Sequence, residues 1–323
     1  MVSCSANTAK AATLQENNAD ILALLMTPGV GSVTVHRIRA LAQAIEEPVG
    51  ALLGLQEAAL QRCLPPGASR EARALARCSP LIRARAGRLL QETLHAGCIA
   101  IRRGEPLYPA SLAHAGGGAA PQILFLKGNI TLMQREAAGV VGTRTPSEAG
   151  LLAARHCAAF FAARGLPVVS GAAPGVDTAA HLAALEHRGT SIAVLPQGML
   201  TYSPCREIEA GLSANRVLLL SEFEPSSPWQ RHAAITRNAT ISALSKILCV
   251  IEPQKEGGSI QTARHSLCGG KPVFYLPRCG PIPQILAQSS AQPLQPTAGT
   301  FPFHLESALR HATPQQIGQG LLF

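Results

Sequence analysis

Apolar residues recur every three or four positions over the first part of the chain, from about residue 18 to residue 95. The segments with this spacing are 19–26, 35–45, 51–64 and 70–94, and short turns that contain glycine or proline join them. A period near 3.6 places apolar side chains on one face of a helix. We therefore predict a small all-helical domain over residues 18–95, preceded by a disordered N-terminus over residues 1–17.

The turn between the first two helices reads Thr27-Pro28-Gly29-Val30-Gly31-Ser32. It is typical of a SAM-like or helix-hairpin-helix domain, in which exposed amides at a helix N-terminus can hold a DNA phosphate. A Gly-x-Gly turn also lets two helices pack closely without binding anything. Both interpretations stay open on the sequence.

The hydrophobic pattern changes after residue 135, where continuous apolar runs alternate with helical segments. The runs are 138–142, 166–171, 191–198, 216–222, 246–252 and 272–277. Strands that are apolar throughout are buried on both faces, which indicates a mostly parallel sheet between two layers of helices. We predict a Rossmann-like, doubly wound α/β core over residues 136–280, with its ligand at the carboxyl ends of the strands.

Two further segments flank this core. Residues 96–135 are rich in glycine and proline, so we expect a mostly irregular connector with one short strand at 123–128. Residues 281–323 are rich in proline, glutamine and serine, and we expect a partly ordered C-terminal extension with one helical stretch near 304–311.

The net charge of +9 adds a functional hint, because basic proteins tend to bind polyanions, most often nucleic acids. Five lysines leave 23 of the 28 basic residues as arginine, whose planar fork suits phosphate. A basic surface kept for solubility, or a genome that favours arginine codons, would give the same composition.

Cysteine usage and hydropathy bear on localisation. The nine cysteines show no Cys-x-x-Cys pair and no metal-ligand spacing, so we expect reduced thiols and no metal. The N-terminus lacks an apolar signal core, and no apolar run is long enough for a membrane span. We expect a cytoplasmic protein that does not contact a membrane.

Glycines, hydroxyls and basic residues follow the predicted strands, where parallel strands bring them to one edge of the sheet. Glycine-lined turns and arginine suit an anion, so these residues predict a phosphate-binding site. They are Gly142, Thr143, Arg144 and Ser147 after the first strand, Ser170, Gly171 and Gly175 after the second, Arg237 and Asn238 before the fifth, and Gly258, Ser259 and Thr262 after it.

Asp177 and His181 stand one helical turn apart, directly after Gly175. Asp177 can cap the helix, and the two side chains can hydrogen-bond across four residues. A catalytic pair would need a nucleophile, and none stands at a recognisable spacing. We therefore predict structural roles for both and no catalytic residue.

The motifs of two common kinds of nucleotide-binding site are missing from the sequence. The first turn reads Gly-Thr-Arg-Thr-Pro-Ser rather than Gly-x-Gly-x-x-Gly, which argues against NAD, and no phosphate-binding loop of the Gly-x-x-x-x-Gly-Lys-Ser/Thr type occurs. We expect no cofactor.

The same residues form an ordered set of motifs that resembles the DNA-processing protein A (DprA/Smf) family from about residue 20 to residue 277. The matching segments are Pro28–Gly31, Tyr108–Leu112, Pro121–Gly128, Val141–Arg144, Ser170–His181, the pair Arg237 and Asn238, and Gly258–Ala263. The resemblance implies a non-enzymatic protein whose core binds single-stranded DNA. It also implies a homodimer formed through the core, and loading of the RecA recombinase onto incoming DNA during natural transformation.

The chain departs from the family pattern in three places. The family's second arginine after the Arg-Asn pair is Ala239 here, and the segment 198–207 lacks the usual Asp and Asn but keeps a basic residue, Arg206, for the DNA phosphates. The tail is too short and too rich in proline for the winged helix of some members. These differences identify a divergent member.

Two alternatives from other classes remain. One is an enzyme on small nucleotides that is similar to the lysine-decarboxylase-like phosphoribohydrolases, although the segment 256–263 lacks their catalytic glutamate. The other is a core that senses a nucleotide ligand.

Overall fold

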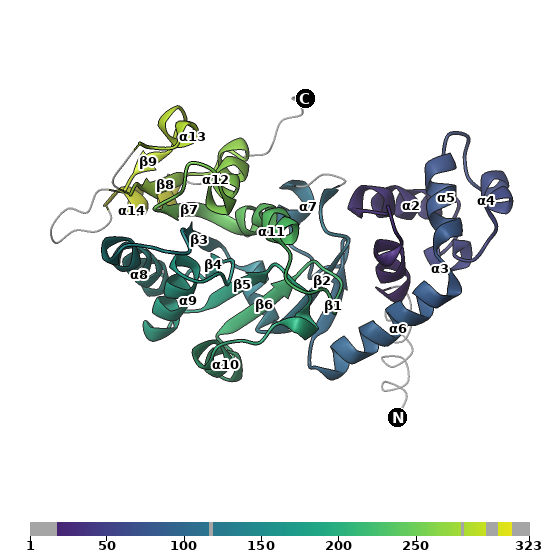
Figure 1. Ribbon diagram of the computed structural model, residues 1–323, viewed down its shortest axis with the longest axis horizontal. Coiled ribbons are helices and arrows are strands. Elements are labelled where there is room, and N and C mark those ends of the chain that lie inside the picture. Colours follow the sequence, from purple (N-terminus) through teal and green to yellow (C-terminus); the bar gives the residue numbers. More distant parts are fainter. Residues whose placement is uncertain (1–17, 116–118, 279–280, 295–302, 312–323) are drawn as a thin grey trace. The chain divides into compact units, whose positions relative to one another are not determined.

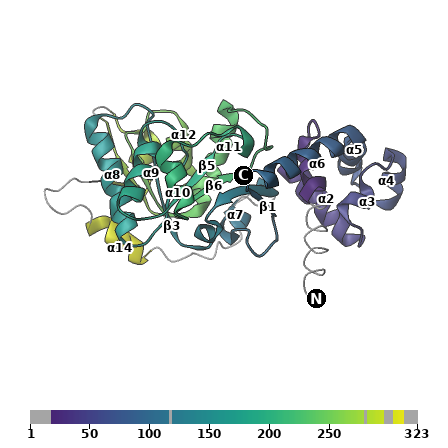
Figure 2. The ribbon, with the colours of Figure 1, turned by 90° about the horizontal axis from the view of Figure 1, so that it is seen from below.

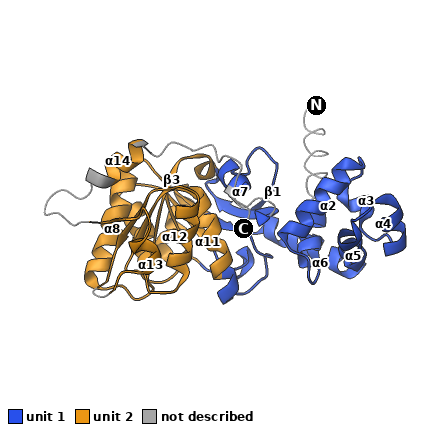
Figure 3. Cartoon of the chain, turned by 90° about the horizontal axis from the view of Figure 1, so that it is seen from above, with its two compact units in different colours: residues 1–130, 195–203, 219–233 blue, residues 131–194, 204–218, 234–323 orange. Residues whose placement is uncertain are grey.

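A computed structural model describes residues 18–115, 119–278, 281–294 and 303–311 of the chain (Figure 1). Two compact units make up the chain (Figure 3). Unit 1 comprises residues 1–130, 195–203 and 219–233, and unit 2 comprises residues 131–194, 204–218 and 234–323. The expected disordered segment 1–17 and much of the C-terminal extension lie outside the described residues.

The first part of unit 1 is all-helical, as predicted. Residues 18–26 are helical and are followed by α2 (Ser32–Ala44), α3 (Val49–Leu52), α4 (Glu57–Cys63), α5 (Ser69–Arg77) and α6 (Pro80–His95). The apolar positions at helical spacing form its core, in which Ile21, Ile38, Leu60 and Leu75 are at most 2% exposed. We call residues 18–95 the helical module.

Two of the predicted helices are each broken into two. The segment 51–64 breaks between α3 and α4, where Gly54 adopts a φ of 91° that a helix cannot accommodate. The segment 70–94 breaks before Pro80, which lacks an amide proton and begins α6. The Ser79 hydroxyl caps this new helix by accepting a hydrogen bond from the Ile82 amide at 3.3 Å.

The connector is more regular than its glycine and proline content indicated. It contains β1 (Ile99–Arg102), α7 (Ala110–Ala115), β2 (Ile123–Gly128) and the 3₁₀ helix η2 (Ile130–Gln134). Strand β1 pairs antiparallel with β2, with Ile99 opposite Leu126. The expected strand at 123–128 is confirmed, whereas β1 was missed because its pairing partner lies more than 20 residues away in the sequence.

The sheet is mixed but mostly parallel, and its strand order is β1-β2-β6-β5-β4-β3-β7-β8-β9. Its remaining strands are β3 (Ala137–Gly142), β4 (Val168–Ser170), β5 (Ser191–Leu195), β6 (Val217–Ser221), β7 (Ser245–Ile251), β8 (Val273–Leu276) and β9 (Gln292–Pro293). The register places Gly139 beside Val169 on one side and beside Leu248 on the other. All six continuous apolar runs are therefore strands, and the predicted Rossmann-like core is confirmed.

Helices cover the sheet of unit 2 on both faces. Figures 1 and 2 show α8 (Glu148–Ala163) and α9 (Val176–Glu186) on one face and α12 (Gly258–Cys268) on the other. Alanines and Phe161 of α8 pack on Val140, Ile247 and Phe274 of the sheet. This helix-on-sheet packing leaves the turns that follow the strands together at one edge.

Five further elements are described. They are α10 (Arg206–Ser213), α11 (Arg231–Leu244), η3 (Met199–Thr201), α13 (Gln284–Ala287) and α14 (Phe303–His311), and α14 confirms the helix expected near 304–311. The only tryptophan of the sequence, Trp229, stands in the loop after β6 and is 47% exposed. Within the described ranges, no helix combines the length and the apolar character that crossing a membrane requires.

Candidate phosphate-binding site

The site is defined by the point at which the strand order changes direction. From β3 the chain adds β4, β5 and β6 on one side, and then returns to place β7 on the other side of β3. The turns after β3 and β7 consequently leave the sheet toward opposite faces. In doubly wound folds such a switch point opens a crevice that binds ligands. Here the flanking turns are residues 142–147 and 252–258.

The turn after β3 packs tightly against the turn after β4. Gly175 adopts a φ of 84°, and an added Cβ there would lie 2.6 Å from the carbonyl oxygens of Thr143 and Arg144. The Val176 amide donates to the Thr143 carbonyl at 3.2 Å. Gly142 is equally constrained, since its Cβ would lie 2.2 Å from the Ile251 carbonyl oxygen. These two glycines permit backbone packing, and they leave the Arg144 side chain exposed at the edge.

The N-terminus of α8 is satisfied by groups of the protein itself. The Ser147 hydroxyl accepts from the Gly150 amide at 3.1 Å and so caps the helix. Glu252, which is buried, accepts from the Ser147 amide at 2.9 Å and also from its hydroxyl. A carboxylate thus already occupies the anion position at this helix end.

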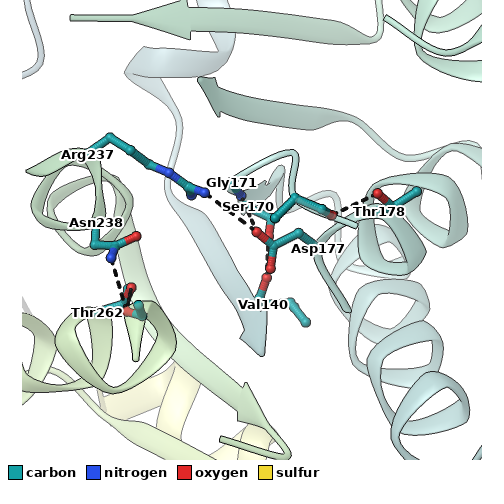
Figure 4. A network of polar contacts seen from close by, with 10 residues as sticks. Val140, Ser170, Gly171, Asp177, Thr178, Arg237, Asn238 and Thr262 are labelled. Carbon is teal, nitrogen blue, oxygen red and sulfur yellow. Dashed lines mark hydrogen bonds and ion pairs between the residues drawn. The ribbon is translucent and has the colours of Figure 1, made fainter. Parts of the chain in front are cut away.

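A buried ion pair joins a residue of α9 to a residue of α11 (Figure 4). Asp177 on α9 accepts from the Gly171 amide at 3.2 Å and lies 3.9 Å from a guanidinium nitrogen of Arg237 on α11. Burial raises the pKa of Asp177, and the Arg237 charge opposes that rise. An added Cβ at Gly171 would lie 1.4 Å from Arg237 Nη1, so only glycine leaves room for the guanidinium.

His181 has a different partner from the one the sequence suggested. Its Nδ1 lies 2.6 Å from the Ser191 hydroxyl on β5, and not against Asp177. The Ser191 hydroxyl in turn donates to the Val168 carbonyl at 3.0 Å. Burial, with a smaller contribution from Arg237, lowers the pKa of His181 to about 4. The histidine is therefore neutral at pH 7 and ties α9 to the sheet.

The other polar residues of the predicted set are also engaged internally. Ser170 is fully buried, and its hydroxyl donates to the Val140 carbonyl at 2.5 Å. The Asn238 amide and the Thr262 hydroxyl both donate to the Gly258 carbonyl, at 3.1 Å and 3.0 Å. We refer to these buried positions as the frame, which consists of Ser170, Gly171, Asp177, His181, Arg237, Asn238 and Thr262.

A second set of residues lies outside the frame and reaches solvent. We call it the rim, and it consists of Arg144, Arg206, Lys255, Gly258, Ser259 and Arg278, of which only Ser259 is half-buried. Within the described structure, α12 has Gly257 at its N-cap position, no side-chain cap and no acidic residue in its first turn. Arg278 donates to the Thr145 carbonyl at 3.4 Å, so it stands at the Arg144 turn.

Sequence reasoning missed four of these positions. Glu252 is the last residue of a predicted strand and Lys255 follows three residues later, so the strand-end rule could have included them. Arg278 follows β8 in the same way. Ser191 begins a strand, and the sequence gives no hint that it meets His181.

The exposed basic side chains and the glycine turns of this edge suit the binding of an anion. Asp177 and His181 are both buried, and they are hydrogen-bonded to the Gly171 amide and to the Ser191 hydroxyl respectively. Across the described ranges, no three His, Cys, Asp or Glu side chains gather where they could hold a metal ion. The seven cysteines in the described part of the chain are free thiols, and Cys4 and Cys279 lie outside it.

Sequence comparison shows where such an architecture occurs. The model of the family described as DNA recombination-mediator protein A matches residues 100–299. Over 159 residues the chain is 33% identical to DNA processing protein DprA of Bacillus subtilis. This alignment covers 49% of this chain and 54% of that protein. Over 164 residues it is 39% identical to protein Smf of Escherichia coli, and this alignment covers 50% of this chain and 43% of that protein. The chain thus aligns with about half the length of these curated relatives.

Solved structures show the same fold. The X-ray structure of DNA processing protein A from Streptococcus pneumoniae superposes with a TM-score of 0.62 at 24% identity, covering 84% of this chain and 89% of that one. A structure of DNA processing protein A from Helicobacter pylori, reported for its single-stranded DNA binding mode, has a TM-score of 0.53 at 24% identity, covering 61% of this chain and 90% of that one.

Proposed function

Because this chain belongs to the DNA recombination-mediator protein A family, we propose that it binds single-stranded DNA with the rim of its Rossmann-like core. The observation that carries the proposal is the position of two rim groups at the switch point. Arg144 follows β3 and the uncapped start of α12 follows β7, on either side of the place where the strand order reverses. An arginine fork and free helix amides are complementary to a phosphate.

The frame supports this binding indirectly. Its buried contacts hold the turns 142–147 and 171–176 and the start of α12 in fixed positions, so that the rim needs little reordering when DNA binds. We propose that Thr143, Ser147, Ser170, Gly171, Gly175, Arg237, Asn238 and Thr262 act in this way and that the direct phosphate contacts come from Arg144, Arg206, Gly258 and Ser259. Arg278 and Lys255 extend the positive rim.

We further propose a non-enzymatic role in DNA processing. The family resemblance supports protection of incoming DNA, loading of RecA and a homodimer formed through the core. The internal bonding of Asp177 and His181 supports the absence of acid–base chemistry at this edge. Few aromatic residues occur, at 4% of the chain, so we expect phosphate contacts rather than base stacking to dominate.

The test is a titration of the full chain with a labelled poly-dT strand over a salt series, read by fluorescence polarisation. Arg144→Gln should weaken binding and lower the slope of log affinity against log salt by about 0.7, the value for one phosphate contact on a single strand. Arg188→Gln is the matched control, because this exposed arginine precedes β5 and stands at the opposite edge of the sheet.

Two results would contradict the proposal. Equal losses in the Arg144 and Arg188 variants would show a diffuse charge effect and no site at the switch point. Failure of the wild-type chain to bind the strand at low salt would reject DNA binding, and nucleoside phosphates would then be the ligands to test.

A further inference from the structure

A basic hollow lies in the helical module of unit 1, and none of its lining residues belongs to the frame or the rim. It has a volume of about 370 Å³ and lies between the turn after residue 27 and α5. Three of its lining residues are arginines, Arg70, Arg73 and Arg77, and the turn contributes Gly29 and Val30. The spacing of i, i+3 and i+7 places the arginines along one face of α5.

The positive charge of this hollow is only partly compensated. Arg73 Nε lies 3.7 Å from a carboxylate oxygen of Glu57, and both side chains are well exposed. Within the described ranges, Arg70 and Arg77 form no ion pair with a carboxylate. Such a row of arginines lining a hollow is a typical anion-binding arrangement.

The opposite wall of the hollow adds backbone N–H donors, which favour an anion as the arginines do. Helix α2 starts after Gly31, and within the described structure it has no side-chain cap and no acidic residue in its first turn. Arg77 stands close to this turn, because an added Cβ at Gly29 would lie 3.8 Å from its Nη1. The arginines and the positive end of α2 therefore line the same hollow.

The composition of the module points to the kind of anion. Residues 18–95 contain nine arginines and no phenylalanine, tyrosine or tryptophan. The module therefore lacks the large aromatic side chains that most often stack on bases, and among the residues that line the hollow only Val30 and Ala74 are apolar. Recognition must then rest on charge and on planar hydrogen bonding, which suits a row of phosphates better than a protein segment.

We propose that this hollow is a second phosphodiester site, which grips a nucleic-acid backbone independently of the rim. It does not read bases, so a duplex and a single strand offer it the same chemistry. A chain with two separate backbone sites would bind DNA more tightly than either site alone, provided that one molecule can reach both.

The test uses the full chain and two labelled DNAs of matched length, a poly-dT strand and a duplex. The variant Arg70→Gln/Arg77→Gln removes two arginines of the hollow. The control Arg62→Gln/Arg88→Gln removes two exposed arginines of the same module that do not line it. For two lost contacts we expect the salt slope to fall by about 1.8 on the duplex or by about 1.4 on the strand, with affinity at least about tenfold lower at low salt.

A third variant separates binding from folding. Gly31→Asp should fold well, because nothing lies within 4 Å of its added Cβ and Asp is a favoured N-cap. Its carboxylate would nevertheless repel a phosphate from the hollow. We expect an unchanged or higher Tm together with weaker DNA binding.

The same measurements are repeated in the Arg144→Gln background, so that failure at the rim and failure at the hollow are distinguished. A loss confined to one DNA identifies that DNA as the ligand of the hollow. The proposal is overturned if the Arg70/Arg77 variant binds both DNAs like the Arg62/Arg88 variant, or if Gly31→Asp leaves binding unchanged.

Discussion

The frame and the rim of the core both contain arginine, glycine and serine, and yet the environments of these residues are opposite. Arg237 is 5% exposed and lies against Gly171 beside the Asp177 carboxylate, whereas Arg144 extends from a neighbouring turn into solvent. A buried charge affects the stability of the fold through its fixed partner, and removing one member of the pair leaves the other buried without compensation. Exposed charges contribute little to stability, and a ligand in solution can reach them.

This contrast separates residues that stabilise the fold from residues that bind DNA, although both kinds stand in the same sequence motifs. Substitutions in the frame should change the free energy of unfolding, and they should change DNA binding only through the fold. Substitutions in the rim should change DNA binding at nearly constant stability. The following predictions test that separation, beginning with the largest expected effect.

Loss of the frame carboxylate should be the most destabilising change. Asp177→Ala leaves Arg237 buried without this carboxylate and leaves the Gly171 amide without its acceptor, so we expect a loss of about 3–5 kcal/mol. Urea denaturation measures it. Asp177→Asn keeps an acceptor for the amide and should lose less. A loss below about 1 kcal/mol for the alanine variant would show that the pair does not stabilise the fold.

The frame histidine should make the fold sensitive to acid. Because the pKa of His181 falls from 6.5 in the unfolded chain to about 4 in the fold, its contribution is fully present above pH 6.5 and is lost as the pH falls toward 4. Between pH 7 and pH 4 we expect this residue to remove about 3 kcal/mol.

Comparison with His181→Gln isolates that effect, because all other groups titrate in both proteins. The difference between their denaturation midpoints should be larger at neutral pH than at pH 4. A constant difference would show that the histidine does not titrate in this range.

The smallest stability effect should come from the rim. Arg206 is exposed at the first position of α10, where a positive charge opposes the helix dipole. Arg206→Gln should therefore leave stability unchanged or raise it by a few tenths of a kcal/mol. The salt slope for poly-dT should still fall by about 0.7. A destabilised variant with normal binding would place Arg206 in the frame instead.

The fold could be predicted largely from sequence because its signals are local. Continuous apolar runs gave all six strands of the core, and helical spacing gave the helical module. The breaks at Gly54 and Pro80 were missed because apolar spacing continues across them, and only backbone conformation distinguishes a bent helix from two helices. Strand β1 was missed because a strand in an irregular composition depends on its distant partner.

The site was harder to predict because a motif at the end of a strand does not show whether each of its side chains points into the protein or into solvent. The rule for parallel sheets brings Ser170 and Arg144 to the same edge, and it does not say that one side chain turns inward and the other outward. The contacts that decide this are long-range. Glu252 meets Ser147 across 105 residues, and Arg237 meets Asp177 through two different helices.

The exposed position of Trp229 has a practical consequence. Since it is the only tryptophan of the chain and no aromatic residue occurs in residues 18–95, ultraviolet emission excited at long wavelength reports on the loop after β6 alone. The helical module is optically silent. A spectral change on adding DNA would therefore monitor the neighbourhood of that loop, while occupation of the α5 hollow would have to be followed with a label on the nucleic acid.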